Sequence, residues 1–377
     1  MTKKRLFFVV GEASGDLHAS HLIKALVKQN RQIEFAGWGG DLMVAAGLNL
    51  KKHYSETAFM GVWNVIINLK KILGFLKTCQ QNIIDYQPDA IVLVDYGGFN
   101  LRIAKWAHER GIRVFYYISP QVWASRPARA YKIKKYVEQL FCIFPFEPEF
   151  YKNYGVEATF VGHPLLDDIT QYQKNELELQ QFVTKYGNPD AEKLIGLLPG
   201  SRKQELQKML PVFVQLAQKL PQFTFYIMQA PSIGADYYAG FIEKEMNVKL
   251  IKNQDFNFVK YLDVALVTSG TATLQVALHQ VPQVVCYKTD PLLYNIAKRI
   301  IKVNYISIVN IVLNRPFLKE LIQKDCNVDN LFKEIYALLN QKEGASRIRQ
   351  GYKDLYTILT KGNASENTAS AILKALN

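Results

Sequence analysis

Two short turns in the second half of the chain have the residue types that bind anions at the start of a helix. They read LPGSR at 198–202 and TSGTAT at 268–273, and each lies between an apolar run and a helix-like one. The first amides of a helix lack intrahelical acceptors, the helix dipole is positive there, and glycine lets a ligand approach closely. Two such turns in neighbouring βα units suit one diphosphate, so we predict a nucleotide-linked substrate.

Arg202 adds a cation to the first of these turns. Its guanidinium could hold phosphate oxygens through two hydrogen bonds, although Glu205, three residues further on, offers an alternative partner. The sequence contains no G-x-x-x-x-G-K-[ST] motif, no G-x-G-x-x-G fingerprint and no Asp-x-Asp pair. Helix ends, Arg202 and lysines would therefore carry the charge of a diphosphate. No metal-ligand pattern accompanies His18 and His21, which we interpret as ordinary histidines.

Two turns in the first half place carboxylates after expected strands. The first reads GEASGD at 11–16, and the second begins with Asp95 and continues with two glycines. Side chains at the carboxyl ends of parallel strands line the ligand crevice, which makes Glu12, Ser14 and Asp16 site candidates. Asp95 suits a general base that takes a proton from a hydroxyl. Capping of a helix by Ser14 or Asp16, and an Asx turn at Asp95, are the structural alternatives.

The segment SPQVWASRP at 119–127 also follows an apolar run. Gln121 and Trp123 could hydrogen-bond to and stack on a sugar, and Arg126 could contact a phosphate. The alternative is a solvated basic helix that carries Arg126, Arg129, Lys132 and Lys135.

Short apolar runs alternate with helical patterns along the whole chain. The first set covers 5–10, 33–37, 90–94, 112–118, 139–144 and 158–161, and the second covers 194–198, 223–228, 264–268 and 283–287. Continuous apolar strands separated by helices are typical of parallel sheets that are covered on both faces. The sequence therefore predicts two Rossmann-like, doubly wound α/β domains.

The expected boundaries follow from composition. We predict an N-terminal domain at 1–168, a C-terminal domain at 190–345, and terminal helices at 346–377 that return to the N-terminal domain. The polar, glutamine-rich stretch 168–190 ends in GNP and reads as a linker. From about Pro316 onward the pattern is helical with no strand.

The composition is that of a basic globular protein. The 377 residues are 49% hydrophobic and carry a formal charge of +13. Residues 1–168 account for +6 of it (21 − 15), so the excess is not a tail but belongs to surfaces that could face nucleic acid, anionic lipid or a phosphorylated substrate. Four scattered cysteines favour a reducing cytosol. The chain start reads as a strand rather than a signal peptide, and no apolar run approaches the ~20 residues of a membrane span. We expect a soluble or peripheral protein.

The stretch 59–77 is apolar except for one narrow polar stripe with flanking lysines. A helix on a sheet needs only one apolar face, so this one could lie in a membrane interface or hold acyl chains. Full burial is the alternative. The expected lipid-contacting residues are Met60, Val62, Trp63, Ile66, Ile67, Leu69, Leu73, Phe75 and Leu76.

With these motifs placed, the chain resembles the lipid-A-disaccharide synthases, inverting glycosyltransferases of the two-domain GT-B fold. The resemblance covers nearly the whole chain and rests on many ordered motifs. They are GEASGD at 11–16, SP and VWA within 119–124, FPFE at 144–147, FVGH at 160–163, LPGSR at 198–202, SGTAT at 269–273, AKR at 297–299 and YIS at 305–307.

The resemblance implies two Rossmann-like domains facing a central cleft, with C-terminal helices packing across them. It also implies condensation of UDP-2,3-diacylglucosamine with 2,3-diacylglucosamine 1-phosphate to a β-1,6 disaccharide and UDP. The catalytic candidates are Asp95 and Glu12. The acceptor-binding candidates are Ser14, Asp16, Asn100, Gln121 and Trp123. The UDP-binding candidates are Gly200, Ser201, Arg202, Ser269, Gly270, Thr271, Ala272, Thr273, Gln275 and Asn310.

We expect no metal or other cofactor and no nucleic-acid partner. The resemblance implies a peripheral location on the anionic cytoplasmic face of the inner membrane of a Gram-negative bacterium, and it leaves a homodimer open. Four positions depart from the common family pattern: Gly98 replaces a second Asp, Gln275 a Glu, Ser125 a Trp and Val309 a Pro. The alternatives are another GT-B nucleotide-sugar enzyme, such as a peptidoglycan N-acetylglucosaminyltransferase or a sugar 2-epimerase, and a catalytically lapsed membrane-surface binder.

Overall fold

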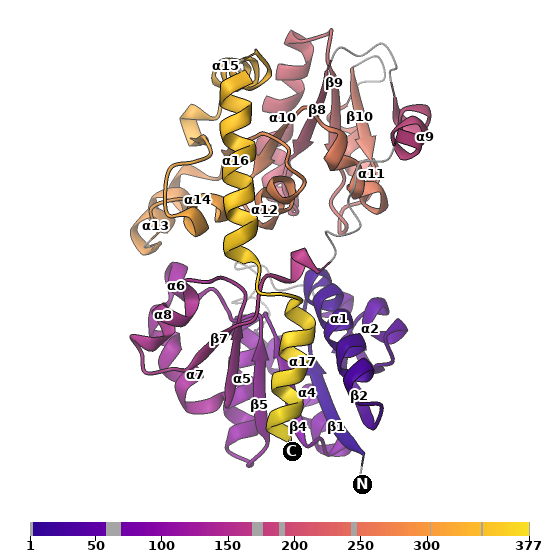
Figure 1. Ribbon diagram of the computed structural model, residues 1–377, viewed down its shortest axis with the longest axis vertical. Coiled ribbons are helices and arrows are strands. Elements are labelled where there is room, and N and C mark those ends of the chain that lie inside the picture. Colours follow the sequence, from indigo (N-terminus) through magenta and orange to yellow (C-terminus); the bar gives the residue numbers. More distant parts are fainter. Residues whose placement is uncertain are drawn as a thin grey trace. The chain divides into compact units, whose positions relative to one another are not determined.

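The computed structural model describes residues 3–57, 69–167, 176–187, 193–242, 247–301, 303–340 and 342–376. The chain divides into two compact units (Figure 1). Unit 1 comprises Met1–Asp167 and Leu359–Asn377, and unit 2 comprises Asp168–Ile358.

Unit 1 is built on a parallel sheet of seven strands in the order β3-β2-β1-β4-β5-β6-β7. The strands are β1 (Lys4–Val9), β2 (Ile33–Gly39), β3 (Asn49–His53), β4 (Ala90–Val94), β5 (Arg113–Tyr117), β6 (Gln139–Cys142) and β7 (Ala158–Phe160). The helices are α1 (Ala13–Gln29), α2 (Asp41–Ala45), α4 (Leu69–Tyr86), α5 (Gly97–His108), α6 (Val122–Ser125), α7 (Ala130–Tyr136), α8 (Glu147–Lys152) and α17 (Ala364–Leu376). Short 3-10 turns occur at η1 (Tyr54–Glu56), η2 (Pro127–Arg129) and η3 (Pro164–Leu166).

The central strands of unit 1 are covered on both faces. Phe7 and Val9 of β1 belong to a buried cluster with residues of α4, α5 and α7. The alternate residues Leu6 and Phe8 point to the other face and are also fully buried. All five residues of β4 are buried as well. This double burial explains why these strands are continuous apolar runs in the sequence.

Unit 2 has a parallel sheet of six strands in the order β10-β9-β8-β11-β12-β13. The strands are β8 (Leu194–Leu198), β9 (Thr224–Met228), β10 (Val248–Ile251), β11 (Val264–Thr268), β12 (Gln283–Tyr287) and β13 (Glu320–Ile322). The helices are α9 (Glu176–Tyr186), α10 (Lys203–Lys219), α11 (Ala235–Ala239), α12 (Thr271–Leu278), α13 (Pro291–Ile300), α14 (Ile308–Leu313), α15 (Val328–Asn340) and α16 (Lys342–Leu359), with 3-10 segments η5 (Asn253–Tyr261) and η6 (Gln323–Asp325). Two separate buried clusters show that this sheet too is covered on both faces.

The prediction of two doubly wound α/β domains is confirmed, and each of the ten expected strands is present. Three further strands were not expected: β3, β10 and β13. All three lie at sheet edges, where one face of the strand meets solvent and the continuous apolar signal is lost. The expectation of no strand after Pro316 is wrong, because β13 spans Glu320–Ile322 and pairs in parallel with β12.

The stretch expected to be a linker contains a helix. Residues 176–186 form α9 of unit 2, and Phe182 is buried in its core, where its ring stacks on Phe258. At the other end of the chain, α16 belongs to unit 2 up to Ile358, and the return to unit 1 begins at 359 rather than at the expected 346. The returning helix α17 packs against α1 (Figure 1).

Candidate active site

Glu12 and Asp95 lie at the carboxyl ends of two neighbouring strands in unit 1. β1 and β4 pair in parallel, with Val9 opposite Leu93, so the chain leaves both strands at the same edge of the sheet. Glu12 is the exposed residue before the first turn of α1, and Asp95 follows β4. Burial, which has the larger effect, and the negative charge of Glu12 together raise the pKa of Asp95 to about 6. The hydrogen bond from the Tyr96 amide has the opposite effect and lowers this pKa. A carboxylate with this pKa is suited to accept a proton near neutral pH.

The backbone around Asp95 is held in an uncommon conformation. Asp95 and Tyr96 both adopt positive φ angles, 45° and 51°. The Tyr96 ring lies so close to Gly11 that a Cβ there would come within 2.6 Å of it, so only glycine fits opposite the ring. The Tyr116 hydroxyl donates to the Asp95 carbonyl at 2.6 Å. Residues other than glycine rarely adopt the left-handed backbone conformation. Where two successive ones do, as here, the position is typical of a functional site.

Asn100 supports this turn from inside the fold. Its side chain is fully buried, and its amide nitrogen lies 2.9 Å from the Asp95 carbonyl, 3.2 Å from that of Val94 and 3.3 Å from that of Val9. The expectation of acceptor contact at Asn100 therefore needs correction: the buried amide holds the ends of β1 and β4 together.

Asp16 has a comparable structural role. It is 3% exposed, and its carboxylate accepts hydrogen bonds from the amides of Gly40, Leu42 and Met43. These amides begin α2, so Asp16 caps that helix instead of its own. The prediction that Asp16 contacts the acceptor is corrected for the same reason, whereas Ser14 of the same turn is exposed.

Glu147 is a buried carboxylate for which we predicted no role beyond its place in the FPFE motif. One of its oxygens accepts from Ser119 Oγ at 2.7 Å and from Trp123 Nε1 at 3.1 Å, and the other from the amides of Ile143 and Phe144. Burial raises the pKa of Glu147 to about 7, although these hydrogen bonds lower it. Trp123 is thus fixed in place, with its ring edge-on to Phe146 and Phe144, and Gln121 beside it is exposed. The signal that could have identified Glu147 in the sequence is an acidic residue inside an apolar stretch that follows a strand.

The two turns of unit 2 lie at the ends of neighbouring strands. β8 and β11 pair in parallel, as the prediction of a shared diphosphate site required. In the first turn, the Glu205 carboxylate accepts from the amides of Ser201 and Arg202 and pairs with the Arg202 guanidinium at 3.2 Å. Arg202 therefore pairs with Glu205, the alternative partner named in the sequence analysis. Gly200, at φ 110°, packs directly against the Glu205 side chain, so an anion at this turn would replace Glu205 at these donors.

The second turn opens α12. Ser269 Oγ donates to the Ile306 carbonyl at 2.6 Å, and Thr273 Oγ1 donates to the Gly270 carbonyl at 2.8 Å. Thr271, at the first position of the helix, is exposed, and Ala272 and Gln275 are half-buried. The amides of Ser269 and Thr273 donate to the carbonyls of Cys286 and Gly270, so the exposed side chain of this turn is Thr271.

Asn310 does not belong to the exposed part of the site. It is 1% exposed, its amide nitrogen donates to the Leu318 carbonyl and to Glu320, and its oxygen accepts from the amides of Phe317 and Leu318. Asn310 therefore anchors the segment that leads into β13, which corrects its expected contact with UDP.

The predicted lipid-contacting helix is described only from residue 69. Leu76 is 7% exposed and lies in the core with Ile72, so its predicted lipid contact is wrong. The Phe75 ring packs edge-on against Trp38, whereas Leu73 is 51% exposed. The other predicted contacts, Met60, Val62, Trp63, Ile66, Ile67 and the side chain of Leu69, lie outside the described residues. None of the described helices has the length and apolar character needed to cross a membrane.

The described residues contain no group of three or more metal-binding side chains. Burial and the neighbouring His21 lower the pKa of His18 to about 4, and burial and His18 lower that of His163 to about 3. Both buried rings are therefore neutral at physiological pH.

Known proteins resemble this chain along its whole length. A family model described as lipid-A-disaccharide synthetase matches residues 6–375. Lipid-A-disaccharide synthase from Geobacter sulfurreducens is 35% identical over 100% of this chain and 98% of its own length. The Coxiella burnetii enzyme of the same name is also 35% identical, over 99% of this chain and 98% of its own.

Solved structures support the fold. A UDP-GlcNAc 2-epimerase from Neisseria meningitidis, bound to UDP-GlcNAc, has a TM-score of 0.67 at 12% identity and covers 99% of both chains. A glycosyltransferase of kitacinnamycin has a TM-score of 0.64 at 14% identity and covers 100% of both chains. These likenesses confirm the GT-B-like, two-domain α/β architecture. The family model and the full-length sequence matches show that the chain belongs to the lipid-A-disaccharide synthase family.

Proposed function

We propose that this chain transfers diacylglucosamine from UDP-2,3-diacylglucosamine to the 6-hydroxyl of 2,3-diacylglucosamine 1-phosphate, giving the β-1,6 disaccharide 1-phosphate and UDP. Membership of the family makes the chain a glycosyltransferase of lipid A disaccharide synthesis. The observation that carries the detailed reaction is the pair Glu12 and Asp95 at adjacent strand ends, with the pKa of Asp95 raised to about 6.

In this reaction the acceptor hydroxyl attacks the anomeric carbon of the donor from the side opposite UDP. The new C–O bond forms as the bond to the diphosphate oxygen breaks, and that oxygen keeps the electron pair. Asp95, ionised at neutral pH, takes the proton of the hydroxyl, and the anomeric configuration is inverted. Glu12 keeps the pKa of Asp95 high, which makes Asp95 a stronger base.

UDP would bind to unit 2 through the turns at the start of α10 and α12. The amides of Ser201 and Arg202 and the Arg202 guanidinium, now paired with Glu205, are donors for phosphate oxygens, and the exposed start of α12 supplies others. These groups favour a transfer that requires no metal ion or other cofactor. We also infer that the acylated substrates are met at the anionic cytoplasmic face of the inner membrane, with exposed Leu73 near the lipid.

The test is product formation by the purified chain with both acylated substrates, measured by mass spectrometry with and without a chelator. We expect the disaccharide 1-phosphate and UDP in both conditions. Asp95→Asn should lower kcat by about 10²–10⁴-fold, because the base is lost. Asp85→Asn, a matched change of an exposed aspartate on α4, should leave kcat unchanged.

Two results would reject this proposal. Turnover of UDP-GlcNAc without acyl chains, and none of the acylated donor, would favour an epimerase or another GT-B enzyme of the kind found among the structural neighbours. Vesicle binding without turnover of either donor would indicate a lapsed homologue.

A further inference from the structure

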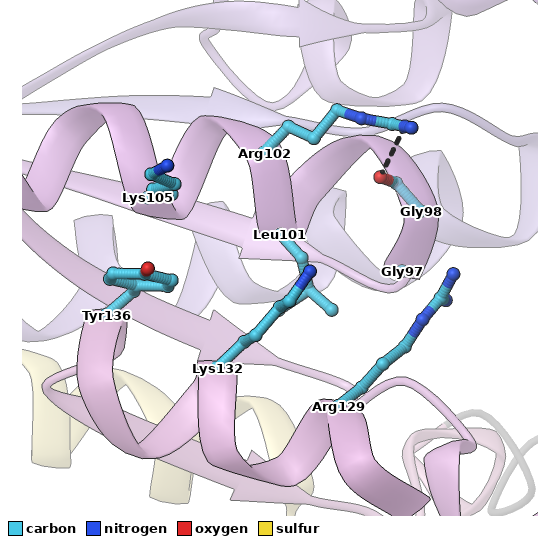
Figure 2. A pocket seen from close by; sticks show the side chains of 8 residues that line it. All are labelled: Gly97, Gly98, Leu101, Arg102, Lys105, Arg129, Lys132 and Tyr136. Atoms are coloured by element: carbon cyan, nitrogen blue, oxygen red, sulfur yellow. Dashed lines mark hydrogen bonds between the residues drawn. The ribbon is translucent and has the colours of Figure 1, made fainter. Parts of the chain in front are cut away.

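A basic cavity of about 220 Å³ lies next to the Asp95 turn in unit 1. It is lined by Gly97, Gly98, Leu101, Arg102, Lys105, Arg129, Lys132 and Tyr136 (Figure 2). Gly98, Arg102 and Lys105 are spaced i, i+4, i+7 and therefore share one face of α5. Lys132 and Tyr136 come from α7, which packs against α5, and Arg129 immediately precedes α7. The cavity is several times larger than the ~30 Å³ that one water molecule occupies.

The positive charge in this cavity is only partly neutralised. Lys105 lies 3.7 Å from Glu109, and Arg102 donates to the Gly98 carbonyl at 3.1 Å. No carboxylate lines the cavity, and within the described part of the chain Arg129 and Lys132 form no ion pair. Burial and the nearby cations Arg126 and Arg102 lower the pKa of Arg129. Cations gathered around a cavity without a counter-charge favour the binding of an anion.

The cavity also offers donors and space for a tetrahedral anion. Gly97 and Gly98 are the first residues of α5, where helix amides lack intrahelical acceptors and the dipole is positive. A Cβ at Gly98 would meet no atom within 4 Å, so this side is open. Figure 2 shows Arg129 and Lys132 extending toward α5 from the neighbouring segment. Arg129 is half-buried and Lys132 is exposed, so both line the cavity while they remain accessible to a ligand from solvent.

We propose that this cavity binds a phosphate monoester, and that the monoester is the anomeric phosphate of the acceptor sugar, an assignment that rests on the proposed function. A phosphate monoester carries close to two negative charges near neutral pH, which matches the gathered cations better than a singly charged group does. Gly97 is two residues from Asp95, so one sugar could place its phosphate in the cavity and its 6-hydroxyl near the base.

The experiment compares two acceptors, 2,3-diacylglucosamine 1-phosphate and the same lipid without its phosphate. The double variant Arg129→Ala/Lys132→Ala should lose about tenfold or more in kcat/KM for the phosphorylated acceptor, because charge-assisted bonds to the phosphate disappear. Its kcat/KM for the dephosphorylated acceptor should stay near that of the wild type. Lys134→Ala/Lys135→Ala removes the same charge from α7 outside the cavity and should change neither value.

A second readout separates this proposal from the proposed function. Equilibrium binding of both acceptors in detergent micelles, followed by tryptophan fluorescence, requires no turnover. If the wild type makes no disaccharide but binds the phosphorylated lipid more tightly, and the double variant loses that preference, the cavity assignment stands without the reaction. If the double variant, folded by circular dichroism, keeps the preference, the assignment is wrong.

Vesicle sedimentation tests the other source of phosphate. If the double variant loses binding to phosphatidylglycerol vesicles while it still prefers the phosphorylated acceptor, the cavity serves lipid head groups and the proposal is overturned. Equal binding of wild type and double variant to these vesicles supports the acceptor phosphate.

Discussion

At the scale of single residues, the site depends on carboxylates in very different surroundings. Glu147 is fully buried and accepts four hydrogen bonds, so it positions Trp123 and the segment after β5 and has no exposed surface through which to reach a ligand. Asp95 is only half-buried and lies beside the charge of Glu12. The first arrangement stabilises structure, and the second leaves a carboxylate partly accessible to a ligand.

Trp123→Phe should destabilise unit 1 in a pH-dependent way. The change keeps an aromatic ring but removes the indole donor to Glu147, at an expected cost of about 1–3 kcal/mol. The donor stabilises the charged carboxylate. Because the pKa of Glu147 is about 7, the loss should be larger at about pH 8 than at about pH 5.

Thermal melts of the wild type and Trp123→Phe at both pH values measure this difference. Trp106→Phe, the same substitution on α5, is the control and should show no such pH dependence. An equal loss for Trp123→Phe at both pH values would mean that the bond to Glu147 is not what fixes the indole.

At the scale of elements, the junction between β4 and α5 organises the site. Two left-handed residues turn the chain from the strand into the helix. Asn100 and Tyr116 hold this turn by hydrogen bonds to the Asp95 carbonyl. The same junction brings the first glycines of α5 to the basic cavity. One short segment therefore positions both the proposed base and the proposed phosphate site.

Asn100→Ala should lower stability more than it affects substrate affinity. It removes the side-chain donor that the carbonyls of Val9, Val94 and Asp95 share, although Asp95 keeps the Tyr116 hydroxyl, at an expected cost of about 2–3 kcal/mol. Asn153→Ala, at an exposed position after α8, should cost less than about 0.5 kcal/mol. Urea unfolding followed by circular dichroism provides both values. A raised KM for the acceptor with unchanged stability would instead restore Asn100 as a ligand contact.

Burial decides which strands and which contacts can be recognised in the sequence. Inner strands such as β4 are buried on both faces and so are apolar without interruption, whereas the edge strand β3 reads NLKKH and carries no such signal. Asp16 and Asn310 look like ligand contacts because they are polar residues next to conspicuous turns. Only the folded chain shows that long-range backbone amides and carbonyls occupy their side chains.

At the scale of the whole molecule, the chain builds two separate parallel sheets that carry different groups at their strand ends. Unit 1 carries the carboxylate pair, the fixed Trp123 and the basic cavity, and unit 2 carries two helix starts at adjacent strand ends. The sequence predicted these two sheets because its continuous apolar runs fall into two sets. It could not predict that Glu205 occupies the amides of the first turn, since that depends on which partner the folded turn selects.

The most direct test of the central claim, that Asp95 is the base and Glu12 tunes it, is the pH dependence of kcat/KM for disaccharide formation. Asp95 must be ionised to act, so the wild-type value should rise with pH through an apparent pKa near 6. Burial and the charge of Glu12 raise that pKa, and Glu12→Gln removes the second cause, so its rise should move to lower pH. A wild-type value that is flat from about pH 5 to 8, or a rise that does not move in Glu12→Gln, would contradict the assignment.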